Sequence, residues 1–168
     1  DGSNAGREAK RILEEERLLV EPDTDELKRQ AKLLEELAKL PLTRYNDAEL
    51  LIDGDATFAA IFDSIAGATD YILVQFYILR DDGLGQKLKR ALIDKAGEGV
   101  RVYVLYDELG SNKLSRDYIQ QLRSAGVLIY PFNTTQGKGN RFRLNFRNHR
   151  KIVVVDGLVA YVGGHNVG

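Results

Sequence analysis

Two short apolar runs on either side of Asp156-Gly157 constrain this chain more than any other feature. Residues 151–155 and 158–162 are rich in β-branched side chains, and Asp-Gly is the dipeptide best suited to a two-residue type I′ turn. The sequence therefore predicts a tight β-hairpin over residues 151–162. Pairing is expected to begin immediately on both sides of the turn, with Val155 opposite Leu158.

Polar side chains gather at the open end of the predicted hairpin. Pairing counted outward from the turn places Lys151 opposite Val162. It also places His149 opposite Gly164, and Asn166 then returns beside the histidine. His149 and Lys151 share a face because side chains alternate along a strand. An imidazole, a fixed cation and an amide in one place suit a phosphate ester.

Asp156 belongs to the other end of the hairpin. It lies seven residues from His149, which is about 23 Å along an extended strand at about 3.3 Å per residue. It therefore cannot orient that imidazole within its own motif. We interpret Asp156 as mainly structural, with the turn and a nearby charge or backbone group as its partners.

These residues form the pattern H-x-K-x4-D-x6-G-x2-N, which resembles the HKD motif of the phospholipase D superfamily. The context of residues 144–151 is similar to that of bacterial cardiolipin synthases. The resemblance extends over about residues 41–168 and assigns no task to residues 1–40. Further support comes from Leu51-Ile52-Asp53-Gly54, from Gln75-Phe76-Tyr77-Ile78 followed by Arg80-Asp81-Asp82, and from Val104-Leu105-Tyr106-Asp107 followed by Gly110-Ser111.

The resemblance implies a phosphatidyltransferase that makes cardiolipin and glycerol from two molecules of phosphatidylglycerol. His149 would be the nucleophile and form a phosphohistidine, while Lys151 and Asn166 would offset charge on the phosphate oxygens. Asp156 completes the catalytic motif. No metal or other cofactor is implied, and the sequence holds no cluster of metal ligands.

Members of the superfamily use two such motifs in one active centre, and this chain contains one. His165 has no lysine two residues later, so it cannot supply the second. The partner is therefore a second HKD half, either further along a longer protein or in a second chain. Two other readings stay open: a phosphodiesterase, as a phospholipase D or a single-motif dimeric nuclease, and a lone half that is inactive or only binds.

Composition is that of an ordinary globular protein. The chain has 168 residues, of which 43% are hydrophobic and 29% charged, and its net charge is −1. This balance gives no reason to expect nucleic acid as a partner. The chain also has no cysteine, which excludes thiolate catalysis and zinc ribbons.

A membrane surface is the expected partner instead. The sequence has no apolar run of the ~20 residues that span a bilayer, so we expect this piece itself to be soluble. The resemblance implies a bacterial inner-membrane protein with a cytoplasmic catalytic domain. Residues 1–40 are predicted to be helical, over 5–20 and 23–40, with a cap at Asp23 or Thr24. They could lie on lipid or form a solvated linker.

From residue 41 onward, strands and helices alternate. This pattern predicts an α/β fold, which the resemblance specifies as one half of a phospholipase D-like sandwich, a mixed sheet flanked by helices. We expect strands at 48–52, 71–79, 100–106 and 127–130. Helices are expected around Phe58–Ile65, from Leu84 to Gly97 or Gly99, and from a cap at Ser115 to Gly126.

Several polar residues are candidates for binding. The segment from Pro131 to Lys151 contains no acidic residue, and its Arg147 and Arg150 are expected to bind phosphate or lipid headgroups, although a solvated loop explains it too. Gly164 would let a ligand approach the backbone closely. Asp107, with Glu108, could orient a histidine or cap the turn after its strand. Gln75 is interpreted as a hydrogen-bonded core amide.

Overall fold

The computed structural model describes residues 24–39, 46–132 and 148–168, and the chain divides into two compact units, residues 1–50 and 51–168. In the first unit, helix α2 (Asp25–Ala38) begins at Thr24, whose Oγ1 accepts the Leu27 N–H at 3.3 Å. This confirms Thr24 as the cap. The helix expected over residues 5–20 lies outside the described residues. So do residues 133–147, which form most of the segment without acidic residues.

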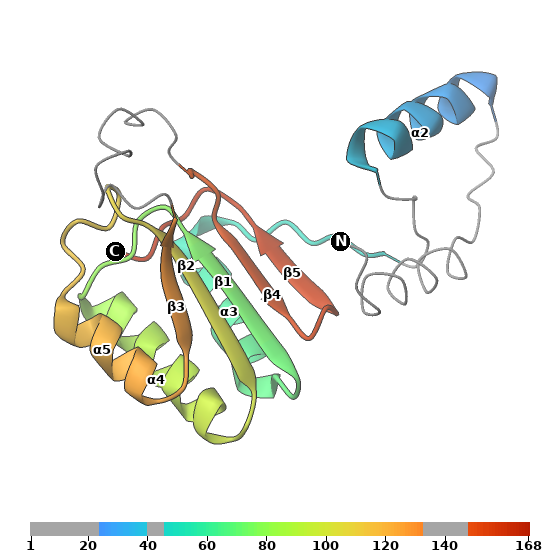
Figure 1. Cartoon of the computed structure of the whole chain (residues 1–168). Helices are drawn as coiled ribbons and strands as arrows, with labels where there is room; N and C mark the ends of the chain where they lie inside the picture. The colour runs from blue at the N-terminus through green and yellow to red at the C-terminus, as the bar shows by residue number, and fades with distance from the viewer. Residues whose placement is uncertain (1–23, 40–45, 133–147) are drawn as a thin grey trace. The chain divides into compact units, whose positions relative to one another are not determined.

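The second unit is built on a five-stranded mixed sheet with the order β3-β2-β1-β4-β5 (Figure 1). Strands β1, β2 and β3 are parallel, whereas β4 runs antiparallel to both β1 and β5. The strands are β1 (Tyr71–Phe76), β2 (Arg101–Asp107), β3 (Leu128–Phe132), β4 (Ile152–Val155) and β5 (Val159–Val162).

In the described residues of this unit, the sheet is accompanied by the helices α3 (Asp53–Gly67), α4 (Gly83–Gly97) and α5 (Arg116–Ser124). Helix α4 begins at Asp82, whose carboxylate accepts the Gly85 N–H at 3.0 Å. Helix α5 begins at Ser115, whose hydroxyl accepts the Tyr118 N–H at 3.0 Å. A side-chain acceptor at this position satisfies an amide that the helix itself leaves free. The predicted cap at Ser115 is confirmed.

The helices α4 and α5 cover the same face of the sheet (Figure 1), as is usual for successive crossovers that step from β1 to β2 and then to β3. The burial of side chains alternates along β1, and the buried ones mark the face that the helices cover. Ile72, Val74 and Phe76 are at most 3% exposed, whereas Leu73 between them is 40% exposed. The main core therefore lies between the sheet and its helices.

The predicted α/β fold with a mixed sheet flanked by helices is confirmed, with two corrections. Residues 48–52 are not a strand: they form no regular structure, and Leu50 and Ile52 are exposed. Their apolar run is short and gives no reliable period, and helix α3 follows it at once. Strand β1 also ends at Phe76 rather than Leu79, although Leu79 makes an isolated bridge to Val167.

The predicted hairpin is present, but its register differs by one residue. Asp156 and Gly157 both have positive φ, as a type I′ turn requires, and the Leu158 N–H donates to the Val155 carbonyl at 3.0 Å. Strand pairing then resumes with Val155 opposite Val159 rather than Leu158. Leu158 is an extra residue on its strand, so the predicted pairing of Lys151 with Val162 is wrong.

Candidate active site

The polar residues of interest lie together at one edge of the sheet. The parallel strands β1 and β2 end there, and β4 begins there because it runs in the opposite direction. Tyr77 follows β1, Asp107 is the last residue of β2, and residues 149–151 precede β4. The carboxyl edge of parallel strands is the usual ligand-binding edge of α/β sheets.

His149 and Lys151 come together at this edge over the ring of Tyr77. The imidazole of His149 is stacked on the Tyr77 ring, with centroids 3.9 Å apart and planes inclined by 26°. The Lys151 ammonium donates to the His149 carbonyl at 2.7 Å and lies 5.4 Å from the Tyr77 centroid. His149 is exposed, so its ring is open to a ligand.

Asp107 holds the backbone next to His149. Its Oδ2 accepts the Asn148 N–H at 3.1 Å, while its Oδ1 accepts the N–H groups of Leu109 and Gly110 at 3.0 and 2.9 Å. Asp107 is only 4% exposed. Of the two tasks considered for Asp107, the turn after β2 is therefore confirmed. The same side chain also fixes the entry to the histidine segment.

Asn166 returns to the same edge, as expected, and is tied to the chain that follows β1. Its Oδ1 accepts the Ile78 N–H at 3.0 Å. The neighbouring Val167 donates to the Ile78 carbonyl at 3.2 Å and accepts from Arg80 at 3.0 Å. No partner for Asn166 Nδ2 occurs among residues 24–39, 46–132 and 148–168. This amide group is the part of Asn166 that remains for a ligand.

Asp156 lies at the opposite end of β1 from Tyr77. One carboxylate oxygen accepts from the Thr69 N–H and hydroxyl at 2.8 and 3.0 Å. The other accepts the N–H groups of Asp70 and Tyr71 at 2.9 and 2.8 Å. These bonds, those from Thr69 foremost, lower the pKa of Asp156 to about 2. Asp156 pins the hairpin turn to the start of β1 and takes no part at the other edge.

The motif and its surroundings match a known family. Residues 61–168 match the family described as "Cardiolipin synthase, PLD-like domain", a segment that contains the whole HKD pattern. The chain belongs to this family. Related proteins include Cardiolipin synthase A of Pseudomonas fluorescens Pf-5, 50% identical over 137 residues, and that of Pseudomonas putida, 53% identical over 137 residues. The match covers 82% of this chain but only 28 to 29% of those relatives.

Two solved structures share the fold. NucT from Helicobacter pylori superposes with a TM-score of 0.51 at 17% identity, over 68% of this chain and 69% of NucT. Nuc from Salmonella typhimurium, a phospholipase D family member, superposes with a TM-score of 0.50 at 20% identity, over 66% of this chain and 64% of Nuc. The five-stranded sheet and its helices are thus a phospholipase D-like fold.

Tyr77 is a residue at this edge that the sequence did not single out as part of the site. It lies in an apolar run, Gln75-Phe76-Tyr77-Ile78, where an aromatic side chain predicts only strand and core. Gln75 also differs from expectation, because its Nε2 is buried and has no hydrogen-bond partner in the described part of the chain. A signal for Tyr77 was available only in its place at the end of a parallel strand.

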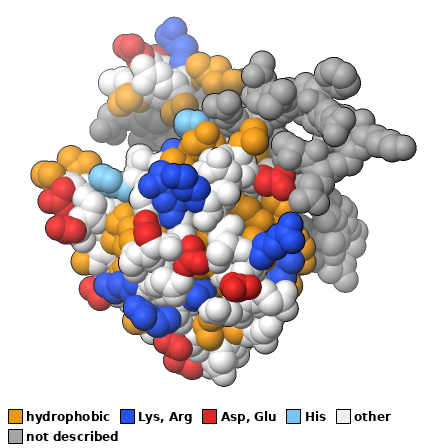
Figure 2. Space-filling model, turned by 90° about the vertical axis from the view of Figure 1, so that its left-hand side faces the viewer, with side chains coloured by type: hydrophobic (Ala, Val, Ile, Leu, Met, Phe, Trp, Pro, Cys, Tyr) orange, Lys and Arg blue, Asp and Glu red, His pale blue; other side chains and the backbone are white. Residues whose placement is uncertain are grey.

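Of the remaining predicted binding residues, the structure describes Gly164 and Arg150. A Cβ added at Gly164 would meet no atom of the described residues within 4 Å, which agrees with the open position expected there. Arg150 is exposed, whereas Arg147 lies outside the described residues. Acidic and basic side chains are interspersed on the face that Figure 2 shows, with pale-blue histidine at the surface. The described residues contain no group of three or more His, Cys, Asp or Glu placed to hold a metal.

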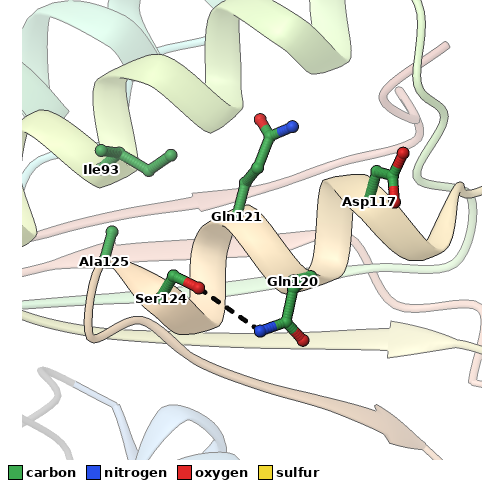
Figure 3. A pocket seen from close by; sticks show the side chains of 6 residues that line it. All are labelled: Ile93, Asp117, Gln120, Gln121, Ser124 and Ala125. Carbon is green, nitrogen blue, oxygen red and sulfur yellow. Dashed lines mark hydrogen bonds between the residues drawn. The ribbon is translucent and has the colours of Figure 1, made fainter.

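A groove of about 500 Å³ lies elsewhere in the second unit, against α5 (Figure 3). Its lining is Ile93, Asp117, Gln120, Gln121, Ser124 and Ala125. None of these belongs to the HKD pattern. The groove is a feature of the helical layer. No helix in the described ranges is both long and apolar enough to cross a bilayer.

Proposed function

We propose that this chain is the first catalytic half of a cardiolipin synthase and transfers a phosphatidyl group through His149. The observation that carries the proposal is the family match over residues 61–168, which includes His149, Lys151 and Asn166 at their family spacing. The geometry at the sheet edge supports it, since His149 is exposed and the ammonium of Lys151 donates to its backbone carbonyl.

The first step forms a covalent phosphohistidine. A nitrogen of the His149 imidazole attacks the phosphorus of phosphatidylglycerol, and the bond from phosphorus to the headgroup glycerol oxygen breaks. A histidine of the second HKD half protonates that oxygen, so free glycerol leaves. Lys151 and the Nδ2 group of Asn166 stabilise negative charge on the non-bridging oxygens in the transition state.

The second step transfers the phosphatidyl group to an alcohol. The histidine of the second half removes the proton from a headgroup hydroxyl of another phosphatidylglycerol, and that oxygen attacks the phosphohistidine. The bond between phosphorus and nitrogen breaks, which yields cardiolipin and regenerates His149. The choice of acceptor distinguishes a synthase from a phospholipase, because water in place of the alcohol gives phosphatidic acid.

Substrate binding at a membrane completes the proposal. Arg147 and Arg150 flank His149 in the sequence and are proposed to bind the headgroup phosphate, and Gly164 leaves the backbone open to a headgroup. These features suit an anionic phospholipid drawn from a bilayer surface. The whole protein then acts at the bacterial inner membrane with this unit on the cytoplasmic side, and this chain alone is inactive because one histidine cannot serve both roles.

A chimera tests the assignment without any assumption about the rest of the protein. The segment of Pseudomonas putida Cardiolipin synthase A that matches this chain over 137 residues is replaced by the corresponding residues of this chain. The chimera is produced in a bacterial strain that lacks cardiolipin synthase, and lipids are quantified by mass spectrometry. We expect cardiolipin to form. The chimera with His149→Ala should form none, and His165→Ala is the matched control that should remain active.

Three results would contradict the proposal. Cardiolipin formed by the His149→Ala chimera would remove this histidine as nucleophile. Phosphatidic acid as the main product would show that the protein is a phospholipase rather than a synthase. Cleavage of plasmid DNA by this chain alone in the presence of a chelator, with sedimentation as a tight dimer, would favour a single-motif nuclease.

A further inference from the structure

We propose that Tyr77 is a positioning residue that orients the His149 imidazole and the Lys151 ammonium for attack on phosphorus. This inference rests on the proposed function of His149 as nucleophile. Tyr77 contacts both groups: its ring stacks on the imidazole at a centroid distance of 3.9 Å and lies 5.4 Å below the ammonium.

His149 needs such a support because of where it lies in the chain. The ladder of β4 begins at Ile152, so residues 149–151 precede the regular strand, and His149 is exposed. An exposed side chain outside a ladder samples several rotamers. A stacked aromatic ring restricts the imidazole to one plane and leaves its edge nitrogens accessible, which suits a nucleophile.

Tyr77 is itself firmly held between β1 and the turn after β2. Its carbonyl accepts the Ser111 hydroxyl at 3.2 Å, and the same Ser111 oxygen accepts the Leu79 N–H at 2.9 Å. Gly110 lies against it so closely that an added Cβ would be 2.3 Å from the Tyr77 carbonyl and 2.9 Å from its ring. The platform under the imidazole is therefore rigid.

The histidine segment is thus fixed at two points. Asp107 holds the backbone through the Asn148 N–H at 3.1 Å, and Tyr77 holds the ring. Both supports come from the carboxyl ends of neighbouring parallel strands, β2 and β1. The Tyr77 hydroxyl has no hydrogen bond to any residue whose position the structure describes. The aromatic face, and not the phenol, is the functional part.

The spectroscopic test uses the 168-residue chain, whose two histidines give two sets of imidazole signals in NMR. The ring current of Tyr77 should shift the His149 ring protons upfield of their position in free histidine. Tyr77→Leu should move them towards the free value, whereas Tyr77→Phe should leave them unchanged. His165 is the internal reference and should not move in either variant.

The kinetic test uses the chimera that reports cardiolipin formation. Tyr77→Leu should lower kcat by about tenfold with little change in KM, the equivalent of about 1.4 kcal/mol of lost orientation. Tyr77→Phe should retain the parent kcat. Thermal melts confirm that each variant is folded. If Tyr77→Leu does not fold, Tyr77→Met removes the ring while it keeps an unbranched apolar side chain at this half-buried position.

The outcomes separate this inference from the proposed function. Unchanged kcat in folded Tyr77→Leu or Tyr77→Met, or His149 signals that do not respond to loss of the ring, would overturn the positioning role while the nucleophile stands. Activity of the His149→Ala chimera would overturn the proposed function, and the positioning role with it, whatever the NMR signals show.

Discussion

Thr69 donates two hydrogen bonds to one carboxylate oxygen of Asp156, at 2.8 and 3.0 Å, across 87 residues of sequence. The second oxygen of the same carboxylate receives the next two backbone N–H groups. The aspartate of the HKD pattern therefore binds the start of β1, at the edge of the sheet away from the histidine. Its role is the attachment of the hairpin to β1, and this attachment sets where β4 begins.

Replacement of Asp156 should destabilise the fold in an acid-dependent way. The pKa of Asp156 in the folded protein is about 2, below its ordinary value of 3.8, so its ionised form stabilises the folded state. This stabilisation is fully present above about pH 4 and is lost as the pH falls towards 2. Asp156→Asn should lower the melting temperature by several degrees at pH 7, and it should flatten the loss of stability between pH 4 and 2.

Asp63→Asn is the matched control for Asp156. Asp63 is an exposed residue of α3, and its carboxylate has no hydrogen bond within the described residues. We expect its thermal melts to follow the parent chain at each pH. An Asp156→Asn variant with parent stability at pH 7 would show that the four bonds at the turn do not stabilise the hairpin.

The two ends of the Asn166 amide allow its structural role to be tested separately from its proposed catalytic role. Its Oδ1 accepts the Ile78 N–H, and its Nδ2 is proposed to contact phosphate. Asn166→Asp keeps an acceptor for Ile78 but replaces the amide donor with negative charge, so it should fold with near-parent stability and lose at least 10²-fold in kcat in the chimera. Asn166→Ala should lose both stability and activity. Parent activity in Asn166→Asp would exclude the phosphate contact.

Gly110 is expected to tolerate no side chain. Because a Cβ there would be 2.3 Å from the Tyr77 carbonyl, Gly110→Ala should cost about 1–3 kcal/mol of unfolding free energy in urea titrations. Gly67→Ala in α3 is the control, since a Cβ there meets no atom of the described part of the chain within 4 Å and alanine favours helix by up to about 1 kcal/mol. Equal stability of the two variants would contradict the tight contact with Tyr77.

Asp107 should couple the turn after β2 to the histidine segment. Asp107→Asn has one acceptor oxygen for three N–H donors, those of Leu109, Gly110 and Asn148. We expect the free energy of unfolding to fall by about 1–3 kcal/mol, because a buried donor is left unpaired. The Asn148 amide should also exchange faster with deuterium. Unchanged exchange at Asn148 would show that Asp107 serves the turn alone.

Local patterns predicted most of the elements. Ser115 as a helix cap, the turn at Asp156-Gly157 and the positions of the strands β1 to β3 could be predicted because each depends on neighbours in sequence. The strand expected at residues 48–52 was wrong because a short apolar run has no diagnostic period. The hairpin register was wrong by one residue, since the extra residue after the turn follows from pairing rather than from turn type.

The sequence by itself determined the hairpin, the spacing of His149, Lys151 and Asn166, and the separation of Asp156 from them. Only the tertiary structure decided what each side chain touches: Tyr77 under His149, Asp107 at Asn148, and Asp156 at Thr69. The physical reason is that these contacts join residues 41 to 87 positions apart, and the strand order β3-β2-β1-β4-β5 is what brings them together.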